Sequence, residues 1–117
     1  MNNFILTISL LVTLAACSES KLPPSEVLSK EQMIPLIVDI EVSQAIYKLK
    51  FANKDSINYH HLMDDVFNAQ NTSQEQFNSS LAYYAKHPKE MEEIYNQAIV
   101  QLTQKQAKVQ SKREEED

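Results

Sequence analysis

The chain has 117 residues with 43% apolar content and a formal net charge of −5, values that fit one small globular domain and exclude two. It contains no glycine, which excludes phosphate-binding loops, dinucleotide-binding turns and nucleophile elbows. Its 16 acidic and 11 basic residues leave no electrostatic footprint for nucleic acid, so we expect no nucleic-acid partner.

Residues 1–16 are predicted to be a bacterial lipoprotein signal peptide. They carry no charge and end in Leu14-Ala15-Ala16-Cys17, which resembles the lipobox before a lipidated cysteine. As a helix, the apolar run from Phe4 to Ala16 would span roughly 20 Å, which is too short for the ~30 Å hydrocarbon core of a bilayer. We expect Cys17, the only cysteine, to become the acylated first residue of the mature protein, with palmitate among its acyl chains. Ser18 after Cys17 favours the outer membrane.

Residues 17–28 are predicted to form a flexible tether, because they are mostly polar and include Pro23-Pro24. The folded domain is expected at 29–103, beginning with a capping box of Ser29 and Gln32. Pro35 leaves two alternatives, a kinked helix or a helix that starts near Ile34. The apolar face of this helix is Met33, Ile34, Ile37, Val38, Ile40, Ala45, Ile46 and Leu49. Asn53 is expected to end it in a left-handed cap conformation.

Three more helices are predicted from apolar residues at helical spacing. The stripe of the second helix is Tyr59, Leu62, Met63, Val66 and Phe67. Thr72 with Glu75, or Ser73 with Gln76, offers a capping box for the third helix, which carries Phe77, Leu81, Tyr84 and Ala85. Pro88 suits the first position of the fourth helix, with Met91, Ile94, Tyr95, Ala98, Ile99 and Leu102.

These elements predict an all-α fold, a small bundle of about four helices. After Thr103 the apolar pattern ends, and only Ala107 and Val109 are apolar in the charged segment up to Asp117. Residues 104–117 are therefore expected to be a solvated, frayed or disordered tail.

One cluster on the second helix has metal-ligand chemistry. His60 with Asp64, and His61 with Asp65, stand four residues apart. The core stripe turns both pairs toward solvent on divergent flanks, so we predict no metal and no cofactor. No free cysteine remains after lipidation, and no serine has a recognisable histidine partner. The sequence therefore predicts a protein that is not an enzyme.

The segment from Phe77 to Tyr95 has two candidate interface residues. Tyr83 cannot fully share the face of Phe77, Leu81 and Tyr84, so either Tyr83 or Tyr84 is expected to present its ring to a partner. His87 before Pro88 is expected at the turn between two helices.

The motifs Phe77-x-x-Ser80-Leu81-x-Tyr83-Tyr84, His87-Pro88 and Ile94-Tyr95, with the stretch from Met33 to Asp39, resemble the domain-of-unknown-function family DUF4296 of small Bacteroidota lipoproteins. The resemblance covers nearly the whole mature domain and implies no known activity, hence no catalytic residues. It also implies that Asp55-Ser56-Ile57 is similar to the O-glycosylation acceptor of that phylum, with Ser56 as the modified residue.

The expected function is that of a lipid-anchored envelope protein, a non-enzymatic interaction module that binds another envelope protein. The alternative is a periplasmic chaperone-like or small-ligand-binding helical protein. An exposed apolar surface favours binding of a partner or client, whereas a closed internal cavity favours a small ligand. The sequence leaves open the face of the membrane and the oligomeric state.

Overall fold

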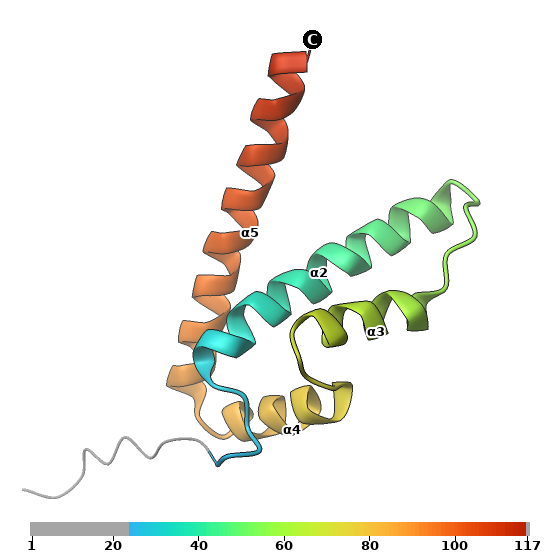
Figure 1. The fold of residues 1–117 in the computed structure, drawn as a ribbon. Helices are drawn as coiled ribbons and strands as arrows, with labels where there is room; N and C mark the ends of the chain where they lie inside the picture. The colour runs from blue at the N-terminus through green and yellow to red at the C-terminus, as the bar shows by residue number, and fades with distance from the viewer. Residues whose placement is uncertain (1–23, 117) are drawn as a thin grey trace, which may run out of the picture.

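The computed structural model describes residues 24–116, which form four α-helices joined by short loops (Figure 1). The helices are α2 (Lys30–Ala52), α3 (Tyr59–Ala69), α4 (Gln74–Ala85) and α5 (Pro88–Glu116). The described residues contain no strand, and the prediction of an all-α fold is confirmed. The predicted signal peptide at 1–16 and the tether up to residue 23, including Cys17, lie outside the described residues.

The start of α2 follows from its cap. The Gln32 N–H donates to Ser29 Oγ, and the Ser29 N–H donates to Gln32 Oε1 at 3.0 Å, so the predicted capping box is present. Pro35 lies inside the helix. The alternative of a helix that starts near Ile34 is therefore wrong, because the capping box satisfies the free N–H groups one turn earlier.

The end of α2 is closed without glycine. Asn53 is the last cap residue as expected, but its φ is −86°, and the left-handed conformation falls on Lys54 with φ of 60°. The Asp55 N–H donates to the Lys50 carbonyl at 3.0 Å, which completes a Schellman-type closure one residue later than predicted. Asn71, with φ of 50°, plays the same part at the end of α3.

Replacing Lys54 by glycine should raise the free energy of unfolding by about 0.5–1 kcal/mol, since a left-handed residue with a Cβ is strained and glycine is not. The matched control is Lys50→Gly, in the last turn of the same helix, which should lower stability by about 1 kcal/mol. Urea denaturation followed by circular dichroism measures both, and two changes of the same sign would contradict the assigned backbone conformation.

The core lies where the first half of α2 meets the other helices. Met33, Leu36 and Val38 are almost completely buried there. Helix α2 packs against both α3 and α5, and α4 packs against α5. The other buried apolar side chains are Leu28, Ile34, Ile37, Ile40, Met63, Val66, Phe67, Tyr84, Ile94 and Ala98. Leu36 is the one fully buried α2 residue that the predicted apolar face omits.

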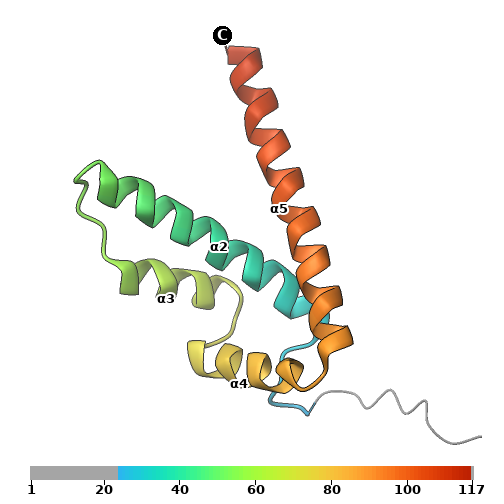
Figure 2. The ribbon, with the colours of Figure 1, turned by 180° about the vertical axis from the view of Figure 1, so that it is seen from behind.

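The second half of the predicted α2 face is not core. Ile46 is 40% exposed and Leu49 66% exposed, and Tyr95 and Ile99 of α5 are exposed as well. These side chains are exposed because of how the helices pack: α2 and α5 lie close at their N-terminal ends and then diverge (Figures 1 and 2). No described element covers the two facing surfaces beyond that point.

Residues 104–116 continue α5 as helix, contrary to the expectation of a frayed or disordered tail. Their side chains are exposed, as expected. The segment holds no glycine or proline and consists mainly of Gln, Lys, Ala, Arg and Glu, which are good helix formers. A helix already nucleated at Pro88 propagates through such residues at little cost.

Candidate interaction site

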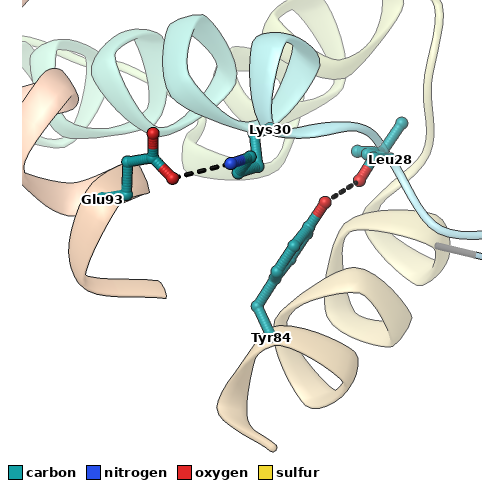
Figure 3. A network of polar contacts seen from close by, with 4 residues as sticks. All are labelled: Leu28, Lys30, Tyr84 and Glu93. Atoms are coloured by element: carbon teal, nitrogen blue, oxygen red, sulfur yellow. Dashed lines mark hydrogen bonds and ion pairs between the residues drawn. The ribbon is translucent and has the colours of Figure 1, made fainter. Parts of the chain in front are cut away.

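A buried clamp fixes the point where the chain enters the domain. Both backbone polar groups of Leu28 bond to α4. Its N–H donates to Ser80 Oγ at 2.9 Å. Its carbonyl accepts from the Tyr84 hydroxyl at 2.9 Å, the bond that Figure 3 shows. Ser80 Oγ in turn donates to the Gln76 carbonyl at 2.7 Å. Since Leu28, Ser80 and Tyr84 are buried, these bonds hold the entering chain on α4. Leu28, predicted as the last residue of the flexible tether, is therefore part of the folded core.

The clamp corrects one predicted interface residue. Tyr84 has no exposed surface, so it cannot present its ring to a partner. Tyr83 is half-buried and stacks on His87, with ring centroids 4.3 Å apart. His87 Nδ1 lies 2.8 Å from the Tyr83 carbonyl oxygen, at the α4–α5 turn where the sequence places it. The role of Ser80 is not predicted from the sequence, where this residue stands out only as part of a motif. A serine four residues before a core tyrosine is the signal that could indicate it.

Burial raises the pKa of the Tyr84 phenol above its ordinary value of 10.0. An unfolded chain therefore ionises first as the pH passes 10, and the free energy of unfolding should fall from there toward the folded pKa. We expect a melting temperature that is steady between pH 7 and pH 9.5 and drops above about pH 10. Tyr84→Phe should flatten this drop, whereas Tyr95→Phe, at an exposed position, should keep it. Thermal melts across this range measure the difference, and equal slopes would contradict the assignment.

Ion pairs join α2 and α5 in the region where the two helices lie close together. Lys30 Nζ lies 2.6 Å from Glu93 Oε2 (Figure 3), and this hydrogen bond raises the pKa of Lys30. Further along, Lys105 Nζ lies 2.9 Å from Asp39 Oδ1, and Gln70 Nε2 donates to Asp39 Oδ2 at 2.7 Å. Such partly exposed pairs add little to stability, because solvent screens the attraction between their charges. Asp39 thus connects α5 and the end of α3 to α2 where the helices begin to separate.

An open groove lies between the diverging halves of α2 and α5, and we call it the α2–α5 groove. Its α2 wall is mostly apolar, whereas its α5 wall combines apolar residues with basic, amide and acidic ones. The α2 side is formed by Glu41, Val42, Ala45, Ile46 and Leu49. The α5 side includes Leu102, Lys105, Gln106, Lys108, Val109, Arg113 and Glu114. Large apolar side chains thus face solvent on both walls.

A second, shallower depression lies at the α2–α3 connection. Tyr47 packs edge-on against Tyr59 with ring centroids 5.1 Å apart, and Phe51 beside them is 70% exposed. Ser56 lines this depression in an exposed loop. The position leaves the Ser56 hydroxyl accessible, and its O-glycosylation stays a prediction.

The histidine pairs of α3 do not converge. His60, His61, Asp64 and Asp65 are all exposed. Within residues 24–116, no three histidine, cysteine or carboxylate side chains come together as a metal site would require. The condition that would favour a catalytic role, a buried histidine beside acidic partners, is not met at these two positions. In the same part of the chain, no helix is both long and apolar enough to cross a bilayer.

The fold and the groove define a small all-α domain with an open cleft between two of its helices. Residues 24–108 match the family described as Domain of unknown function (DUF4296), and the chain belongs to this family. The predicted resemblance is thereby confirmed at the level of the family. No curated protein and no solved structure matches the chain.

Proposed function

We propose that the protein is a lipid-anchored, non-enzymatic module that binds another protein of the cell envelope through the α2–α5 groove. The observation that carries the proposal is the exposure of Ile46, Leu49 and Val109, at 40%, 66% and 55%, on facing walls of one groove. Removing apolar surface from water stabilises a complex by about 25 cal/mol per Å². Such a groove is therefore a ready binding surface.

The anchor in this proposal is the lipid on Cys17, which rests on the lipobox-like sequence, and Ser18 favours the outer membrane. The described chain starts at Pro24 near α4, whereas the distance between α2 and α5 widens toward the C-terminus of α5 (Figure 1). The seven residue steps from Cys17 to Pro24 span at most about 25 Å. An anchor at Cys17 would thus hold the closed end of the domain near the membrane and leave the groove open on the far side.

The non-enzymatic part of the proposal is supported by the groove itself. Its polar side chains are Lys, Arg, Glu and Gln, with no serine, cysteine or histidine among the lining residues. A nucleophile with an adjacent general base, as acyl-transfer chemistry requires, is thus not available on these walls.

The test is chemical crosslinking in intact membranes, followed by affinity purification of the wild type and of Cys17→Ala. We expect one specific envelope protein with the wild type and its loss with the variant. Mass spectrometry of the native protein should show an acylated Cys17 as the first residue. Failure to recover a specific partner, or an unmodified thiol with residues 1–16 still attached, would overturn the proposal.

A chaperone-like role is the second candidate, because an open apolar groove also suits unfolded clients. The same purification separates the two roles: one stoichiometric partner supports the interaction module, whereas many unrelated proteins in small amounts support a chaperone.

A further inference from the structure

We propose that the α2–α5 groove receives an amphipathic helix of the partner, with apolar residues against α2 and carboxylates against α5. This inference rests on the proposed function and adds the chemistry of the occupant. It follows from the shape of the two walls, from their unequal charge, and from what the chain itself could offer as an occupant.

The shape of the groove suits a helix. On α2, Val42, Ala45 and Leu49 recur at intervals of three and four residues, and on α5, Leu102, Gln106 and Val109 recur at four and three. Rows with this spacing form ridges into which the side chains of a third helix interlock. An extended peptide gains its main-chain hydrogen bonds from a sheet edge, and residues 24–116 contain no strand that could supply one.

The two walls differ in charge. Four of the chain's 11 basic residues fall between Gln104 and Arg113, a stretch without any acidic residue. Lys105 is paired with Asp39. Lys108, Arg113 and Glu114 line the groove on the same wall, so its lining has three cations and one carboxylate. The α2 wall contributes Glu41 as its only charged lining residue. Carboxylates of an occupant would therefore meet cations on the α5 side, and its apolar residues would meet Ile46 and Leu49 on the α2 side.

A second copy of this chain is a poor occupant. Its exposed α5 end, the segment free to enter the groove, carries only Ala107 and Val109 as apolar residues between Thr103 and Glu116. These two side chains cannot cover the apolar α2 wall.

The experiment uses the lipidated mature protein in nanodiscs of zwitterionic lipid and two synthetic helical peptides. Both peptides have the same leucine seam and one tryptophan; one has glutamates on its flanks and the other lysines. The protein contains no tryptophan, so peptide fluorescence reports binding directly. We expect the glutamate peptide to bind at least about tenfold more tightly at low salt, with a smaller ratio in 1 M salt.

Reversing the charges on the α5 wall tests whether that wall binds the glutamates of the peptide. The double variant Lys108→Glu with Arg113→Glu should reverse the preference between the peptides. The matched control is Lys86→Glu with Lys89→Glu, which changes the same number of charges at exposed positions outside the groove and should leave the preference unchanged. Circular dichroism checks that each variant keeps its helix content and melting temperature.

Three other outcomes would overturn the proposed acidic helix, the proposed function or both. Equal binding of the two peptides, or a preference that survives reversal at Lys108 and Arg113, overturns the acidic helix while a captured envelope partner still supports the proposed function. A crosslinked product between two copies that uses groove residues overturns the inference in favour of self-association. No peptide binding together with no captured partner defeats both proposals.

Discussion

Replacing Tyr84 by alanine should lower the free energy of unfolding by about 3–5 kcal/mol, because it leaves a cavity at a fully buried position and unpairs the Leu28 carbonyl. A domain of this size is stabilised by about 5–15 kcal/mol in total. The variant should therefore lose a large share of its stability and melt at a clearly lower temperature than the wild type. Urea denaturation followed by circular dichroism measures the change.

The adjacent Tyr83 is the matched control. Its ring is half-buried and packs on His87 at the surface, so Tyr83→Ala should cost about 1 kcal/mol. Tyr84→Phe, which keeps the ring and loses only the hydroxyl, should cost about 1–2 kcal/mol. Equal destabilisation by the two alanine variants would contradict the burial of Tyr84 and the clamp on Leu28.

Replacing Val109 by glutamate should reduce partner capture by about tenfold or more, because the change places a charge on an apolar contact at the centre of the groove. Stability should change by less than about 0.5 kcal/mol, since the side chain is largely exposed in the free protein. Quantitative mass spectrometry of crosslinked, affinity-purified membranes measures the yield of partner.

Val100→Glu is the control for this experiment. Val100 and Val109 lie on the same helix and are both 55% exposed, but Val100 does not line the groove. The two substitutions are chemically identical, so a difference in capture reports position alone. Similar losses from both variants would place the binding surface elsewhere on α5.

The sequence predicts the helices well because their signals are local. The capping box of Ser29 and Gln32, the N-terminal position of Pro88 and the apolar spacing of α3 each involve residues within two turns of one another. Asn53 ends α2 as predicted, but the left-handed conformation expected at Asn53 falls on Lys54. Without glycine, the choice between Asn53 and Lys54 for the left-handed position depends on how the following loop turns, which a propensity does not encode.

The candidate site is not visible in the sequence because it depends on how the helices pack. The apolar stripe of α2 continues through Ile46 and Leu49 as if all of it were core, and only the divergence of α5 leaves these residues exposed. Tyr83 and Tyr84 are equally plausible interface residues until α4 is oriented against Leu28. The link from Asp39 to Lys105 joins residues 66 positions apart, a separation that helical periodicity does not reach.

The most direct test of the account is site-specific photo-crosslinking in living cells, with a photoreactive amino acid at position 49 in the groove or at position 100 outside it. We expect a discrete product with another envelope protein from position 49, no such product from position 100, and loss of the product when Cys17 is also replaced by alanine. The same products from both positions, or none from position 49, would contradict a partner-binding groove held at the membrane.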